Sequence, residues 1–114
     1  MSDERRFTLK ELEAMYAGDE EGLTEILSLF LQDAPERLDA LRSCLDSGDI
    51  PRAAKAAHGI ANLLGAVRNH SGVEAARETE RSLNAENLSE ARISGVRCEQ
   101  EVAAVLERIR ERGI

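Results

Sequence analysis

The sequence predicts an all-α protein, an antiparallel four-helix bundle with a short N-terminal capping helix. Apolar residues recur at three- and four-residue spacing, and no run alternates apolar and polar residues as a half-buried strand does. Aromatic residues make up only 3% of the chain and Trp is absent, so the core must be aliphatic, which suits helix-on-helix packing. We expect one stand-alone domain over residues 1–114.

The first helix is predicted to begin at Thr8, which forms a capping box with Glu11 three residues later. Phe7 directly precedes this cap, where it can staple the helix onto the rest of the protein. Gly18 marks the predicted end of the helix. We expect this short helix to cover one end of the bundle.

A long second helix is predicted over residues 19–46, ended by Ser47 and Gly48. Pro35 lies inside it and predicts a kink or a break near residues 31–34, because proline lacks an N–H donor and clashes with the preceding turn. The apolar stripe of this helix consists of Leu23, Ile26, Leu27, Phe30, Leu31, Ala34, Leu38, Leu41 and Leu45.

Asp49 is predicted to cap the third helix, with Pro51 tolerated in its first turn. Residues 68–72 indicate a turn, and a weaker amphipathic stretch follows over residues 73–83. A final helix is predicted over residues 89–112, where Gly95 costs about 1 kcal/mol relative to Ala. Its apolar stripe is Ile93, Val96, Val102, Val105, Leu106 and Ile109.

Composition excludes several classes of protein. The formal charge of −7 argues against nucleic-acid binding, which needs clustered Lys and Arg. No apolar run approaches the roughly 20 residues of a membrane span, and the N-terminus lacks the apolar segment of a signal peptide. Cys44 and Cys98 have no ligand-like spacing, so we expect reduced thiols that pack as small hydrophobic residues in a cytoplasmic protein.

The residues present also argue against an enzyme with catalytic activity of its own. The glycines are scattered at helix ends and form no phosphate-binding loop. Neither cysteine has the context that activates a nucleophile beside His58 or His70. No pair of histidine and carboxylate ligands shares a helix face, so we expect no metal site.

His58 is the residue that stands out. On a helical projection it lies opposite the core-facing residues of the third helix, which are Ala53, Ala56, Ala57, Ile60, Leu63, Leu64 and Val67. An isolated exposed histidine is most often a solvated residue without a role. A neutral imidazole can nevertheless attack phosphorus through a ring nitrogen, and the phosphoramidate so formed passes the phosphoryl group on readily. A bundle without a metal site would have to use its partner's metal ion.

The chain resembles the histidine-containing phosphotransfer (HPt) domain family, four-helix bundles that carry phosphoryl groups in multistep phosphorelays. The resemblance lies in residues 7–12, 18–23, 30–38 and 41–58, the last of which leads up to Ala56-Ala57-His58. It implies that His58 is the phosphoacceptor. It also implies receiver domains, a sensor histidine kinase or both as partners, with Mg²⁺ supplied by the receiver.

The motif after the histidine departs from the family pattern. The family has His-x-x-Lys-Gly, whereas this chain has Ala61 in place of the lysine and Asn62 in place of the glycine. Lys55, one turn before His58, could supply the missing positive charge. Asn62 could donate an amide hydrogen bond to a phosphoryl oxygen.

Two hypotheses follow. In the first, His58 relays a phosphoryl group to or from a receiver aspartate, and the partner docks on a face formed by Ala54, Ala61 and Gly65. In the second, the missing lysine and glycine mark an adaptor that binds a signalling partner without phosphotransfer. We expect a monomer that contacts neither nucleic acid nor membrane, although a homodimer through the long second helix stays open.

Overall fold

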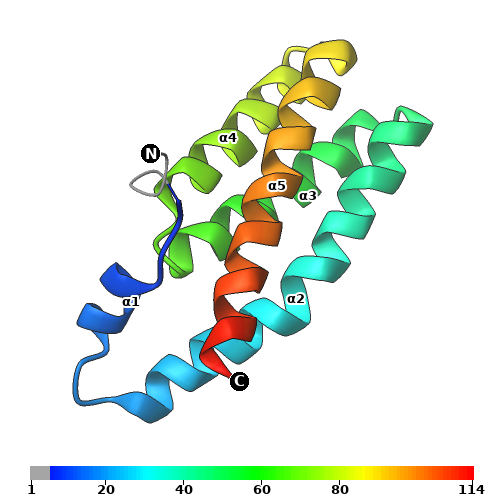
Figure 1. The fold of residues 1–114 in the computed structure, drawn as a ribbon. Coiled ribbons are helices and arrows are strands. Elements are labelled where there is room, and N and C mark those ends of the chain that lie inside the picture. The colour runs from blue at the N-terminus through cyan, green and yellow to red at the C-terminus, as the bar shows by residue number, and fades with distance from the viewer. Residues whose placement is uncertain (1–5) are drawn as a thin grey trace.

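The computed structural model describes residues 6–114, and most of these residues lie in five helices. The helices are α1 (Lys10–Met15), α2 (Glu20–Ser47), α3 (Ile50–Ala66), α4 (His70–Asn84) and α5 (Leu88–Arg112). Helices α2 to α5 run alternately up and down, each packs on the next, and α5 returns to pack on α2 (Figure 1). The predicted all-α, antiparallel four-helix bundle with a short N-terminal helix is confirmed.

Helix α1 begins later than predicted, and the predicted capping box does not form. The N-cap position is Leu9, whose side chain makes no capping hydrogen bond. The Thr8 hydroxyl accepts only a long hydrogen bond of 3.4 Å, from the backbone N–H two residues on. Glu11 points away from the cap toward other parts of the bundle. The last helical residue is Met15, and Gly18 follows in the turn that leads to α2.

Burial and ion pairs fasten α1 over one end of the bundle. Leu12 is fully buried, and Phe7 packs partly buried against the core, as the stapling prediction required. One carboxylate oxygen of Glu11 lies 2.9 Å from His70 Nε2, and the other lies 3.2 Å from Arg68 Nε. These two partners lower the pKa of Glu11, the His70 hydrogen bond most strongly.

Helix α2 runs without a break through Pro35, so of the predicted kink or break near residues 31–34 the break does not occur. Pro35 cannot donate to the carbonyl of Leu31, but both residues are exposed, and water can therefore satisfy that carbonyl. The Asp19 side chain caps the helix by accepting from the Gly22 N–H at 3.0 Å. Gly48 ends it at φ +76°, a left-handed conformation that glycine adopts without a steric penalty. The buried side chains of α2 are Leu23, Leu27, Phe30, Ala34, Leu38, Leu41 and Leu45.

The turn between α3 and α4 is shorter than predicted. Helix α4 begins at His70 because the Asn69 side chain accepts from the Gly72 N–H at 3.0 Å and so caps the helix. The Asn69 amide also donates to the Glu101 carboxylate at 3.1 Å, which ties this turn to α5. The turn of the α3–α4 hairpin is therefore fixed by one nearly buried side chain, that of Asn69, which is 2% exposed.

The first half of α5 presents a different face to the core than the predicted stripe. Ile93 and Val96 are 63% and 53% exposed, whereas the smaller side chains of Ala91, Ser94 and Gly95 are buried. The helices pack closely here, and only small residues fit between them. In the second half the predicted residues Val102, Val105 and Ile109 are buried as expected, together with Cys98 between the two halves.

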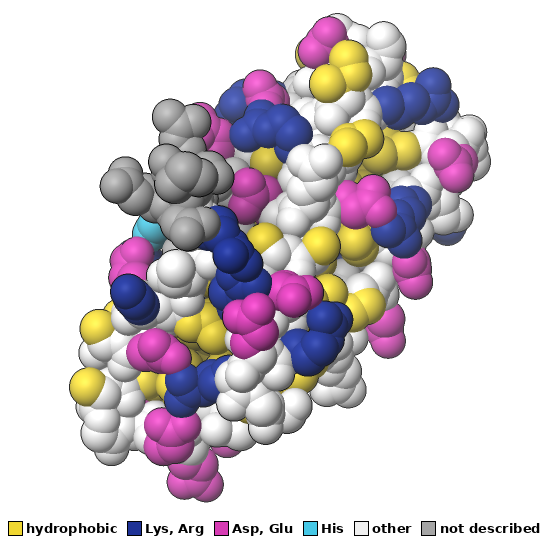
Figure 2. Space-filling model, viewed as in Figure 1, with side chains coloured by type: hydrophobic (Ala, Val, Ile, Leu, Met, Phe, Trp, Pro, Cys, Tyr) yellow, Lys and Arg dark blue, Asp and Glu magenta, His cyan; other side chains and the backbone are white. Residues whose placement is uncertain are grey.

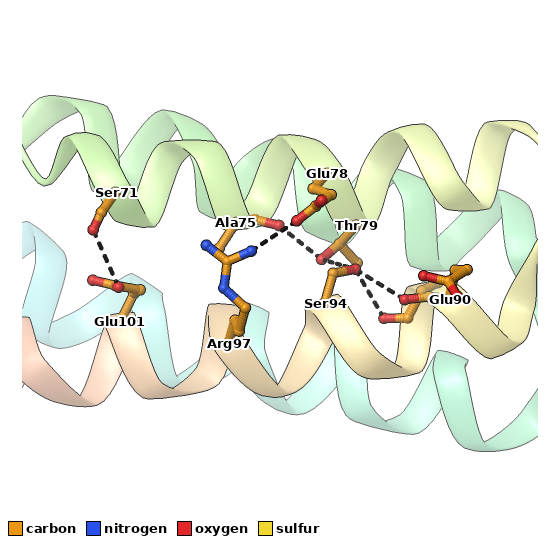
Figure 3. A network of polar contacts seen from close by, with 9 residues as sticks. Ser71, Ala75, Glu78, Thr79, Glu90, Ser94, Arg97 and Glu101 are labelled. Atoms are coloured by element: carbon orange, nitrogen blue, oxygen red, sulfur yellow. Dashed lines mark hydrogen bonds and ion pairs between the residues drawn. The ribbon is translucent and has the colours of Figure 1, made fainter.

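Polar contacts connect α4 to α5 along their length (Figure 3). In the buried centre, the Thr79 hydroxyl lies 2.9 Å from the Ala75 carbonyl oxygen and 3.0 Å from the Ser94 hydroxyl. At the solvent edge, Arg97 donates to the Glu78 carboxylate at 2.8 Å. These contacts fix the position of α4 along the axis of α5. This position also sets where the side chains of α4 lie in the candidate site described below.

The visible surface is mixed in charge (Figure 2). Hydrophobic side chains on this face gather over α2 and α5, where Leu38, Leu41, Leu45 and Val96 line a shallow groove. Within residues 6–114, no helix has the length and apolar character needed to cross a bilayer.

Candidate functional site

His58 lies in the middle of α3, on the side away from the core. Its side chain is 62% exposed, while its neighbours Ala57 and Ile60 are fully buried. The Asp49 side chain caps α3 by accepting from the Arg52 N–H at 3.3 Å, as predicted. The local sequence therefore sets the helix phase that turns the imidazole outward.

Glu80 of α4 orients the imidazole ring. His58 Nδ1 lies 3.2 and 3.3 Å from the two carboxylate oxygens of Glu80, whose side chain is only 26% exposed. A carboxylate can only accept here, so Nδ1 must carry the proton. In the neutral ring Nε2 then has a free lone pair, and no hydrogen bond within residues 6–114 engages it.

The imidazole and its carboxylate partner lie in one shallow hollow between α3 and α4. Three further polar side chains of the hollow come from α4, two of them arginines that the sequence analysis did not select. The hollow is lined by His58, Ala61, Asn62, Arg77, Glu80, Arg81 and Asn84.

The register of the α3–α4 hairpin brings these residues together. His58 precedes Asn69 at the turn by as many residues as Glu80 follows it, and these two side chains are in contact. Gly65 and Val73 form a second pair that is symmetric about Asn69, and they also face each other across the hairpin. The signal that could have found Glu80 is therefore the length of the turn. The turn predicted over residues 68–72 extends into α4 and so does not reveal this symmetry.

The two tentative phosphoryl-binding residues occupy different surroundings. Asn62 lines the hollow beside His58, where its amide can reach a group on the ring. Lys55 is exposed on α3 and forms no ion pair with any carboxylate of residues 6–114, but it does not line the hollow. The structure therefore places Asn62, and not Lys55, in the same hollow as the imidazole.

The predicted docking face of Ala54, Ala61 and Gly65 is less exposed than expected. Ala61 is only 6% exposed because α4 packs over it, so the expectation of an exposed Ala61 is wrong. Ala54 and Gly65 are half-buried. Small residues here bring α4 close to α3, and this close packing forms the floor of the hollow.

Gly59 allows an arginine of α2 to lie close against α3. A Cβ atom at position 59 would lie 2.5 Å from a guanidinium nitrogen of Arg37. Any side chain there would displace Arg37, which is exposed at its other side. Glycine at position 59 thus leaves room for the Arg37 side chain between α2 and α3, and Arg37 does not line the hollow that contains the imidazole.

Other chemistries find little support in the described residues. Within residues 6–114, no group of three or more His, Cys, Asp or Glu side chains is arranged to hold a metal ion. The residues around His58 offer one imidazole and one carboxylate, which do not make a metal site. Burial raises the pKa of the Cys98 thiol to about 12, aided by Glu101 and Glu99, so this thiol stays protonated and unreactive.

The fold and this site define a helical bundle that displays an oriented, accessible imidazole in the middle of α3. The family model described as "Hpt domain" matches residues 25–112, which include all of α3, α4 and α5 and most of α2. The chain therefore belongs to the Hpt domain family, whose members are phosphocarriers of two-component phosphorelays. No curated protein and no solved structure matched the chain.

Proposed function

We propose that this protein carries a phosphoryl group on Nε2 of His58 and exchanges it with the aspartate of a receiver domain. The observation that supports this proposal most directly is the Glu80 contact, which keeps the proton on Nδ1 and leaves the Nε2 lone pair facing solvent. Family membership supports the class of reaction, and the contact between His58 and Glu80 across the hairpin supports Nε2 as the reacting atom.

In the transfer step, the Nε2 lone pair forms a bond to phosphorus while the bond between phosphorus and the aspartate oxygen breaks. The aspartate carboxylate leaves with the electron pair, and the ring, still protonated on Nδ1, becomes positively charged. The Glu80 carboxylate stabilises that charge through its hydrogen bond. The same contacts act in reverse when the phosphoryl group moves on.

The partner supplies what this chain lacks. The described residues provide no metal-ligand set, so we propose that Mg²⁺ comes from the receiver and that the bundle contributes the nucleophile and its positioning. On this proposal the chain is a carrier without catalytic activity of its own. A sensor histidine kinase is a second possible phosphoryl donor.

The test is phosphotransfer to the purified protein from a phosphorylated receiver in the presence of Mg²⁺. We expect acid-labile, base-stable label on the wild type and none on His58→Gln, with both proteins folded by circular dichroism. Equal labelling of the two proteins would exclude His58 as the acceptor.

A non-phosphorylated adaptor is the second candidate, favoured by Ala61 at the position where the family has lysine. An adaptor would bind its partner equally well with His or Gln at position 58, and it would take no phosphoryl label from any receiver tested. Binding measured by titration calorimetry beside the labelling assay therefore separates the two functions.

A further inference from the structure

We propose that Arg77 and Arg81 of α4 bind the phosphoryl oxygens on His58 and so replace the lysine that is absent at position 61. This inference rests on the proposed function, because it assigns positioning residues to that same site. It moves the positive charge of the site from α3 to the facing helix.

Both arginines line the hollow that contains the imidazole. They are four residues apart and therefore lie one above the other on a single face of α4, and Glu80, which contacts the ring, is on this helix between them. Both side chains are exposed, so they are free to move toward a group attached to Nε2. The two arginines also line the adjoining hollow beside Gly65, and so they form the ridge between the two.

Two of the three carboxylates of α4 are engaged elsewhere, and the third, Glu74, lines the adjoining hollow but forms no ion pair with either arginine. Glu78 accepts from Arg97 of α5 at 2.8 Å, and Glu80 is held by His58. Neither Arg77 nor Arg81 forms an ion pair with any carboxylate of residues 6–114, whereas seven other arginines of that range do. Two unpaired guanidinium groups beside a nucleophile can receive an anion.

The charge already present at the ring creates a need for these cations. A phosphoryl group on Nε2 brings about two negative charges to a ring whose other nitrogen already contacts the Glu80 carboxylate. Like charges this close repel, and Ala61 supplies nothing to offset the repulsion. Guanidinium groups match phosphoryl oxygens with paired N–H donors, and they stay charged at every physiological pH.

The experiment compares Arg77→Gln/Arg81→Gln with Arg77→Lys/Arg81→Lys. The matched control is Arg42→Gln/Arg110→Gln, which removes the same charge from exposed positions on α2 and α5. Phosphoramidate serves as the donor: its P–N bond breaks, ammonia leaves, and Nε2 forms the new bond to phosphorus. The readouts are the labelling rate, the half-life of the phosphohistidine and its phosphorus-31 chemical shift.

We expect the Gln pair to be labelled about tenfold more slowly than the control pair, because it loses two charge-assisted contacts that solvent screening weakens. We also expect a shifted phosphorus-31 signal and partial recovery of the rate in the Lys pair, which restores charge without the paired donors. A Gln pair that equals the control pair in rate, half-life and chemical shift would overturn the inference.

The proposed function is tested in a separate labelling experiment, in which phosphorylated receivers replace phosphoramidate as the donor. If phosphoramidate labels His58 and no receiver does, the relay function fails while the comparison of arginine variants still decides the role of α4. If neither donor labels the wild type, both the function and the inference are wrong.

Discussion

Replacing Glu80 with glutamine tests the orientation of the imidazole with the smallest change in shape. The amide oxygen of the variant can still accept from Nδ1, but the negative charge that stabilises the ring during transfer is lost. A hydrogen bond to a charged group contributes about 1.5–3 kcal/mol. Because His58 is 62% exposed and Glu80 is 26% exposed, solvent screening reduces this effect, and we take about 1–1.5 kcal/mol. The expected result is phosphotransfer about five- to tenfold slower than in the wild type.

The assay is a rapid-quench measurement of transfer from a phosphorylated receiver under single-turnover conditions, with the concentration of the bundle varied to separate binding from transfer. Glu74→Gln is the control, since it removes the same charge from an exposed position on α4 that makes no contact with His58. Screening by salt should reduce the difference between the two variants. If Glu80→Gln transfers as fast as Glu74→Gln at low salt, Glu80 does not stabilise the ring.

Three further predictions concern stability. Asn69→Ala removes the cap of α4 and should lower the free energy of unfolding by about 1–2 kcal/mol, measured by urea denaturation. The contact with His70 lowers the pKa of Glu11 below its ordinary value of 4.5. The stability that this contact gives should therefore be present above pH 4.5 and be lost as the pH falls below that value. In urea titrations, the stability of Glu11→Gln should depend less on acid pH than that of the wild type. Burial raises the pKa of Cys98 from 9.0 to about 12, so the thiol loses its proton at lower pH in the unfolded chain than in the native protein. The free energy of unfolding should therefore fall as the pH rises through that range. Cys98→Ala should remove this part of the pH dependence. A thiol reagent at pH 8 that labelled Cys98 as fast as the half-buried Cys44 would contradict its burial.

The fold was predictable because strong local signals agree with the packing. Asp49 followed by Pro51 marks the start of α3, and Gly48 marks the end of α2, at the positions the structure shows. The apolar stripe of α2 is regular enough that one proline did not interrupt the helix. Prediction failed in the first half of α5 because large residues were assumed to face the core. Side-chain size alone does not show where two helices approach closely enough to require Ala or Gly.

The exposed imidazole of the candidate site was predictable and its neighbours on α4 were not. His58 was found because its helix phase depends only on local sequence. Glu80, Arg77 and Arg81 lie on the next helix, so their position relative to His58 depends on the length and capping of the intervening turn. A capping asparagine followed by His70 inside the helix was not recognised as a helix start, and this error of a few residues hid the carboxylate that faces the ring.

The Asn69 turn gives this protein a particular vulnerability to changes in length. Inserting one residue between α3 and α4 would rotate every later side chain of α4 by about 100° relative to α3. Such an insertion would leave His58 and its surrounding sequence intact, yet Glu80 would no longer face the imidazole. Among relatives of this chain, the length of the α3–α4 turn would therefore separate those that keep an oriented ring from those that keep only the histidine.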